Sequence, residues 1–123
     1  MAEYGLLVDY EYCTGCESCV VACKETHDFP VGKWGIRVFD DGPWQTTTPT
    51  VLKTLADECV RAIFFPIGKH ATYYPEILKQ VAAAGHTIGG HTWGHVALTN
   101  KKLNEQQRKD EIEKGFSAVK WAL

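Results

Sequence analysis

The stretch Val60–Phe65, with the sequence VRAIFF, decides the fold of this chain. It is a short apolar run of the length and composition typical of a buried strand. A helical pattern precedes it, in which Thr48 provides an N-cap and Pro49 the first helical residue. The apolar stripe of this expected helix consists of Val51, Leu52, Leu55 and Cys59. We therefore expect Cys59 to be a core residue.

A second helical pattern follows the strand. Pro75 opens it, and Gly85 is well placed to end it. One face of this expected helix carries Ile77, Leu78, Val81 and Ala82. Residues 34–39 read as an earlier strand, whereas residues 87–89 are too few for a strand to be assigned. Because strands alternate with helices, we expect right-handed crossovers and a parallel sheet within residues 39–123.

The last part of the chain has the pattern of a third helix. Asn104 followed by Gln107 resembles a capping box. Apolar residues then recur at helical spacing, at Ile112, Phe116, Val119 and Leu123. The charged positions between them face outward on this reading, which indicates a solvated surface.

The composition excludes several classes of protein. A chain of 123 residues favours one domain, and 45% hydrophobic with 23% charged residues is ordinary for a globular protein. The net charge of −2 comes without a basic stripe, so we expect no nucleic-acid partner. No apolar run approaches the roughly 20 residues of a membrane span, and the first residues lack a signal-peptide pattern. We therefore expect a cytoplasmic location.

Four cysteines near the start form the spacing C-x2-C-x2-C-x3-C, at Cys13, Cys16, Cys19 and Cys23. This spacing is typical of a [4Fe–4S] cluster in a reducing compartment. In two-cluster proteins the fourth cysteine of such a run binds the other cluster, and this chain has no second run. The spacing therefore does not decide whether the fourth ligand of the cluster is Cys23 or another group. The competing interpretation is that the cysteines are small buried apolar residues.

The cysteine run and its surroundings carry a family resemblance. Residues 4–10, 22–25, 27–28 and 31–36 look like the start of the electron-transfer iron–sulfur subunits of molybdopterin oxidoreductases of the dimethyl sulfoxide reductase type. The resemblance implies a ferredoxin-like 4Fe–4S segment at residues 1–38. It also implies electron transfer to a molybdopterin oxidoreductase catalytic subunit.

A second set of residues has the chemistry of a metal site. Asp40 and Asp41 stand before a turn at Gly42-Pro43, and His91 and His95 lie four residues apart among glycines. A carboxylate and two neutral imidazoles suit Zn²⁺ or a similar divalent ion, and three protein ligands leave room for water and substrate. The alternatives are an ordinary turn at the aspartates, and a surface pair or satisfied core residues at the histidines.

These residues resemble the motifs of the polysaccharide deacetylases, the NodB-homology family of carbohydrate esterases. Residues 39–43 look like the first motif of that family, 91–95 the second, and 62–71 the strand and loop between them. The resemblance implies that Asp40 is the general base and that Asp41 binds the metal with His91 and His95. It implies a distorted (β/α) barrel. Val38 replaces the threonine usual before the first motif.

The expected fold is therefore α/β, a partial (β/α) barrel of the NodB deacetylase type preceded by a short ferredoxin-like iron–sulfur segment. Residues 39–123 form the deacetylase-like domain on this reading, truncated after its first two motifs, because a complete (β/α)8 barrel takes about 250 residues.

The function implied by the second resemblance is metal-dependent hydrolysis of acetyl groups on an acetylated polysaccharide or oligosaccharide, which truncation would impair. In that family a histidine of a later motif protonates the leaving amine. One alternative is a 4Fe–4S electron-transfer module, and another is a non-functional fusion of two fragments. Proteins of the resembled families also act in the periplasm or at the cell surface.

Overall fold

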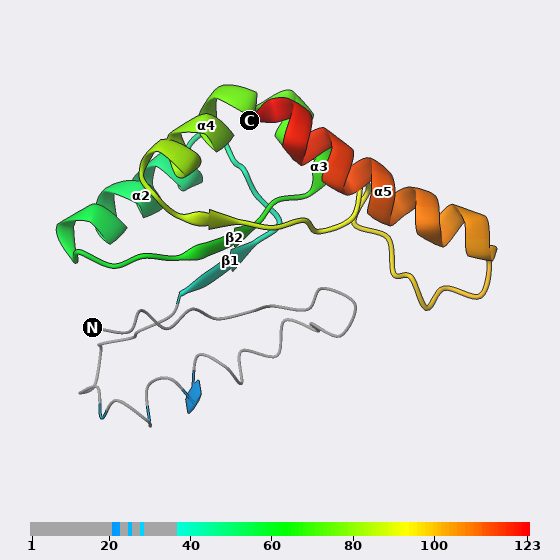
Figure 1. The fold of residues 1–123 in the computed structure, drawn as a ribbon, viewed down its shortest axis with the longest axis horizontal. Helices are drawn as coiled ribbons and strands as arrows, with labels where there is room; N and C mark the ends of the chain where they lie inside the picture. Colours follow the sequence, from blue (N-terminus) through cyan, green and yellow to red (C-terminus); the bar gives the residue numbers. More distant parts are fainter. Residues whose placement is uncertain (1–20, 23–24, 26–27, 29–36) are drawn as a thin grey trace, which may run out of the picture.

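The computed structural model describes residues 21, 22, 25, 28 and 37–123. Within residues 37–123 the chain alternates between strands and helices (Figure 1). The strands are β1 (Val38–Asp40), β2 (Ile63–Phe65) and β3 (Thr87–Ile88). The helices are α2 (Thr47–Asp57), α3 (Gly68–Tyr73), α4 (Pro75–Ala83) and α5 (Glu105–Ala122).

The three strands form a parallel sheet in the order β1-β2-β3, which confirms the parallel sheet expected from the sequence. Asp40 pairs with Phe65, and Phe64 pairs with Ile88. β2 is shorter than the apolar run, residues 60–65, that predicted it. Val60 does not join the sheet, because its N–H donates to the Leu55 carbonyl and so belongs to the end of α2.

The start of α2 differs from the prediction. The helix begins at Thr47 with Thr46 as its N-cap, so Thr48 lies inside the first turn. The Thr48 hydroxyl accepts a hydrogen bond from the Trp44 N–H at 2.9 Å, and the Thr48 N–H donates to the Trp44 carbonyl at 3.2 Å. Thr48 therefore ties the helix to the preceding turn, a role that a local capping pattern does not reveal.

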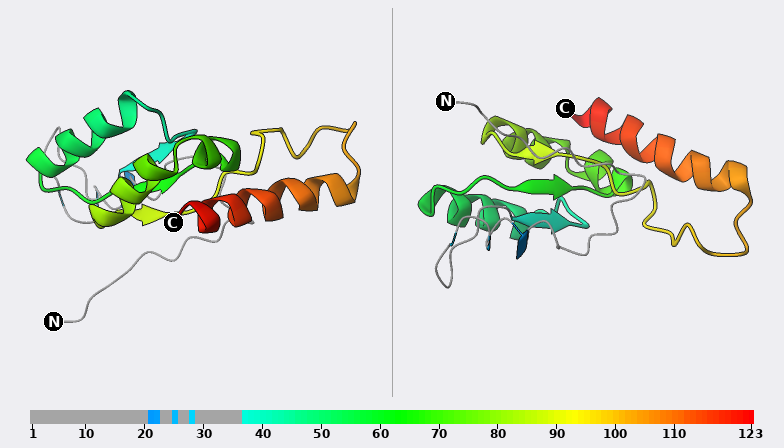
Figure 2. Two further views of the ribbon diagram at one scale, coloured as in Figure 1. Left: turned by 90° about the horizontal axis from the view of Figure 1, so that it is seen from above. Right: turned by 60° about the horizontal axis from the view of Figure 1, so that its bottom comes forward.

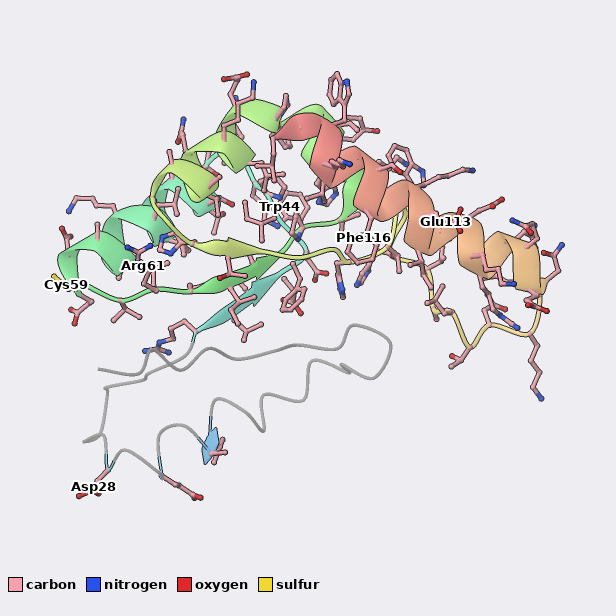
Figure 3. The ribbon with its side chains drawn as sticks, in the orientation of Figure 1. Asp28, Trp44, Cys59, Arg61, Glu113 and Phe116 are labelled. Atoms are coloured by element: carbon pink, nitrogen blue, oxygen red, sulfur yellow. The ribbon has the colours of Figure 1, made fainter. Side chains whose placement is uncertain are left out.

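The expectation that Cys59 is a core residue is wrong. Cys59 lies just beyond the last turn of α2, is exposed and has a φ of +54°. Its N–H donates to the Ala56 carbonyl and the next N–H to the Leu55 carbonyl, the arrangement in which helices commonly end on a left-handed glycine. Figure 3 shows the Cys59 side chain at the outer end of α2. The helical stripe therefore stops at Leu55.

Gly85 ends α4 as predicted. With a φ of +78°, it donates its N–H to the Ala82 carbonyl, and His86 donates to the Val81 carbonyl. Pro75 stands at the start of the helix, also as predicted. No sequence pattern predicted α3, which ends at Tyr73 because Tyr74 precedes a proline and such a residue disfavours the helical conformation.

The helices cover one side of the sheet, as Figures 1 and 2 show. Two groups of buried side chains fill the interface. The first joins α2, β2 and α4 through Leu55, Ala62, Phe64 and Val81. The second joins α3, α4 and α5 through Ala71, Leu78, Val119 and Ala122. Each of the buried leucine, valine and phenylalanine side chains contributes about 1.5–3 kcal/mol of transfer free energy, and each alanine less.

The predicted apolar stripe of α5 is correct only at Val119. The buried positions are Gly115, Ala118, Val119 and Ala122, whereas Ile112, Phe116 and Leu123 are substantially exposed. Small residues face inward because α5 lies very close to α3: a side chain added at Gly68 would place its Cβ 2.8 Å from the Gly115 Cα. Across the part of the chain that the structure describes, no helix has the length and apolar character needed to cross a membrane.

Candidate metal centre

Three predicted site residues meet at one edge of the sheet. Asp41 follows β1, and His91 and His95 lie in the segment after β3. The carboxyl ends of parallel strands share one edge, so residues distant in the sequence come together there. The ligand atoms of Asp41, His91 and His95 all lie within 4.8 Å of one another. Among the residues described, this is the one group of its kind.

One carboxylate oxygen is at the centre of the group. The Nε2 atoms of His91 and His95 each lie 3.1 Å from Asp41 Oδ1, and the two imidazole rings have centroids 4.9 Å apart. Asp41 Oδ1 is itself buried, yet it makes no hydrogen bond of acceptable geometry within the described residues. The rest of the Asp41 side chain is half-exposed. The two ring nitrogens thus lie close to this oxygen without forming a hydrogen bond of good geometry with it.

The backbone at this group is unusual. Asp41, Thr92 and His95 have φ values of +63°, +57° and +57°, in the left-handed region that residues other than glycine rarely adopt. Each such residue costs of order 1–3 kcal/mol and persists only where its surroundings hold it. Strain of this kind clusters at functional sites. Here it lies on two of the three residues of the group and on Thr92 between the two histidines.

The segment that carries the histidines is held by α3. Its carbonyls at Thr92 and Trp93 accept hydrogen bonds from the N–H groups of Gly68 and Lys69, at 2.8 and 3.0 Å. These donors stand at the start of α3, where helical N–H groups lack partners within the helix.

Helix α5 holds the same segment from the other side. The Trp93 N–H donates to the Glu111 carbonyl at 2.8 Å, and the Gly94 N–H donates to Glu111 Oε2 at 2.8 Å. The His95 N–H donates to the Thr92 hydroxyl at 3.1 Å. The histidine segment is therefore fixed between α3 and α5. Sequence analysis missed Glu111, because no local pattern shows that it reaches the segment.

The other predicted site residues are placed as follows. Asp40 ends β1 with an exposed side chain, next to Asp41 in the chain but not a member of the three-residue group. Cys13, Cys16, Cys19 and Cys23 lie outside the described residues, so the predicted cluster stays a prediction.

A further histidine lies at the opposite end of the strands. His86 precedes β3, and its Nδ1 accepts a hydrogen bond from the Ala62 N–H at 3.2 Å. Burial lowers the pKa of His86, and the positive charge of Arg61 lowers it further. A donor directed at Nδ1 also requires that this nitrogen be unprotonated. Both effects favour the neutral form of His86.

Comparison with known proteins points to a single family. The family model described as polysaccharide deacetylase matches residues 34–122. A peptidoglycan-N-acetylglucosamine deacetylase of Bacillus cereus is 42% identical over 76 residues, which are 62% of this chain and 27% of that protein. A chitooligosaccharide deacetylase of Azorhizobium caulinodans is 43% identical over 67 residues, which are 54% of this chain and 32% of that protein.

The fold shows the same similarity. The structure of the peptidoglycan deacetylase PdaC from Bacillus subtilis superposes with a TM-score of 0.66 at 32% sequence identity, covering 71% of this chain and 43% of that one. The chain thus spans less than half the length of each of these three proteins.

Proposed function

The chain belongs to the polysaccharide deacetylase family, and from this we propose that it hydrolyses acetyl groups on an acetylated polysaccharide or oligosaccharide with the help of a divalent metal ion. The observation that carries the proposal is the convergence of His91 and His95 on one buried, unsatisfied oxygen of Asp41. The two motifs that contain these residues are far apart in the sequence. The sequence alone therefore does not show that their side chains meet.

The three residues fit a divalent ion. Two imidazole nitrogens and a carboxylate oxygen are suitable ligands for Zn²⁺ and related ions. Without a cation, the buried Asp41 Oδ1 would be an unsatisfied polar atom, which is costly. A shared cation would satisfy this oxygen and both nitrogens together. We therefore assign metal binding to Asp41, His91 and His95.

A bound ion of this kind lowers the pKa of its water and polarises a carbonyl group. We assign the general base to Asp40, whose carboxylate takes a proton from the attacking water. Support for this role comes from its position beside Asp41 and its exposed side chain. The oxygens of Asp40 can accept a proton only if they do not bind the metal. The three-residue group does not include Asp40, which supports this role.

The substrate we propose is an N-acetylated hexosamine in an oligomer or polymer. Two relatives of this chain are named for N-acetylglucosamine in peptidoglycan and for chitooligosaccharide, and both substrates contain N-acetylated glucosamine units. Acetate release from N-acetylated chitooligosaccharides is therefore the first activity to measure.

Metal titration tests the site separately from turnover. We expect His91→Ala and His95→Ala each to abolish binding of one Zn²⁺ per chain in calorimetry. His86→Asn is the matched control, because it removes an imidazole remote from the group and retains an acceptor for the Ala62 N–H. Zinc affinity unchanged in both alanine variants would show that the assigned ligands are wrong.

A second variant separates the base from the ligands. We expect Asp40→Asn to keep zinc affinity and to lose acetate release by about 10²–10⁴-fold, the usual contribution of general base catalysis. Loss of zinc binding in Asp40→Asn would instead make Asp40 a ligand.

We also propose a 4Fe–4S segment within residues 1–38, with Cys13, Cys16, Cys19 and Cys23 as candidate ligands and a molybdopterin oxidoreductase catalytic subunit as electron-transfer partner. The support is the cysteine spacing. Protein purified without oxygen should contain iron and acid-labile sulfide in equal amounts, and replacement of the cysteines by serine should remove both. Zinc without iron in the unaltered protein would contradict this second proposal.

A further inference from the structure

The Asp41 backbone needs a partner to hold its conformation. With a φ of +63°, Asp41 is the central residue of a turn closed by a 2.8 Å hydrogen bond from the Gly42 N–H to the Asp40 carbonyl. Three-residue turns with positive φ are rare and strained. If Asp41 relaxed to negative φ, its peptide would rotate and its carboxylate would leave the two histidines.

His70 supplies a hydrogen bond to this strained residue. Its Nδ1 lies 2.7 Å from the Asp41 carbonyl oxygen. A carbonyl oxygen only accepts, so at this distance Nδ1 must carry a proton and donate it. His70 lies in α3, whose first N–H groups bind the histidine segment. One short helix therefore contacts the backbone of both halves of the metal site.

The surroundings of His70 protect this hydrogen bond. The Trp44 ring lies against the imidazole, with centroids 4.4 Å apart and planes inclined by 57°. The Ile67 N–H binds the neighbouring Gly42 carbonyl at 2.9 Å, which fixes the chain after the turn. The His70 bond acts on the backbone of Asp41 itself. A hydrogen bond partly shielded from water is stronger than an exposed one.

We propose that His70 is a positioning residue for the metal site, holding Asp41 in its left-handed conformation so that Oδ1 meets His91 and His95. This inference rests on the proposed function. His70 donates to the backbone of a ligand and is not a ligand itself. Loss of a group that orients a metal ligand typically costs about 10–100-fold in metal affinity.

A pair of variants isolates the hydrogen bond from the packing. His70→Leu keeps bulk beneath Trp44 and removes the donor. His70→Asn places an amide N–H close to the position of Nδ1 and so retains a donor. In calorimetry with Zn²⁺, we expect His70→Leu to lose about 10–100-fold in affinity and His70→Asn to stay within about threefold of the unaltered protein.

A spectroscopic measurement accompanies the titration. The d–d absorption of bound Co²⁺ reports ligand geometry, so we expect it to change in His70→Leu and to return in His70→Asn. Thermal unfolding without metal gives the stability of each variant and separates loss of the site from loss of the fold. His70→Ala is measured in parallel as a second variant without the donor.

Three outcomes would overturn the proposal. The first is unchanged zinc affinity in folded His70→Leu or His70→Ala. The second is affinity in folded His70→Asn as weak as in the leucine variant. The third is failure of both donor-free variants to fold, which would make the bond a requirement of the fold. If the unaltered protein binds no metal, the proposed function itself fails, and that result is distinct from the other three.

Discussion

Gly115→Ala tests whether α5 positions the metal ligands. A Cβ built on Gly115 would lie 2.5 Å from the Thr92 carbonyl carbon and 2.7 Å from its oxygen. Carbon atoms in contact are normally about 3.5–4.0 Å apart. Both obstructing atoms belong to the backbone, so no side chain can turn away. The helix and the histidine segment must therefore separate by about 1 Å.

Two opposing terms set the effect of this change on stability. Overpacking costs about 1–3 kcal/mol. Replacing glycine by alanine within a helix gains about 1 kcal/mol. The net destabilisation we expect is therefore about 0–2 kcal/mol, which leaves the protein folded.

The effect on the site should be larger than the effect on stability. Thr92 lies between His91 and His95, so a shift of its backbone moves both ligands. Metal–ligand distances tolerate only about ±0.2 Å, so we expect Gly115→Ala to weaken zinc binding by about 10–100-fold. Ser117→Ala on the same helix, at an exposed position, is the matched control and should bind zinc normally. The reasoning fails if folded Gly115→Ala binds zinc as tightly as the control.

Three further predictions concern stability. Asn104→Ala removes the hydrogen bond that Asn104 accepts from the Gln107 N–H at 2.8 Å, and should cost about 1 kcal/mol in urea unfolding; an unchanged midpoint would show that the capping box contributes nothing. Cys59→Gly relieves the backbone strain of a cysteine in the left-handed conformation. This strain of about 1–2 kcal/mol exceeds the stability lost through the larger conformational entropy of glycine in the unfolded chain, so Tm should rise by about 2–5 °C. A lower Tm would contradict this. The His86 pKa is lowered from 6.5 by burial and then by Arg61, so the unfolded chain binds more protons below that pH. The contribution of His86 to stability is thus complete above pH 6.5 and declines as the pH falls toward the folded pKa. His86→Gln should flatten this dependence in unfolding measured across that range, and an identical slope would assign it to other groups.

The sequence predicted features that depend on local chemistry. The parallel sheet, the glycine stop at Gly85 and the capping box at Asn104 all follow from short patterns, and the structure confirms each of them. Asp41, His91 and His95 were expected to act together, and the structure brings them to one place, although their roles remain proposals.

The errors arose where tertiary contacts override local pattern. Cys59 occupies a left-handed position that glycine usually fills, so it ends the helix on the surface instead of continuing its apolar stripe. On α5 the sequence favoured large apolar residues for the interior, but the close approach of α3 admits small ones such as Gly115 and Ala118. His70 gave no signal, because its partner Asp41 lies 29 residues earlier in the chain.

The convergence of Asp41, His91 and His95 also bears on how the chain is held together. An ion bound by the residues that follow β1 and β3 would act as a reversible cross-link over all the chain between them, which includes α2, β2, α3, α4 and β3. Cross-links that close long loops restrict the unfolded chain most. At a free zinc concentration of about 100 times Kd, linkage alone would add about 2.7 kcal/mol of stability. Metal supply would then regulate the stability of the fold as well as the reaction at the metal site.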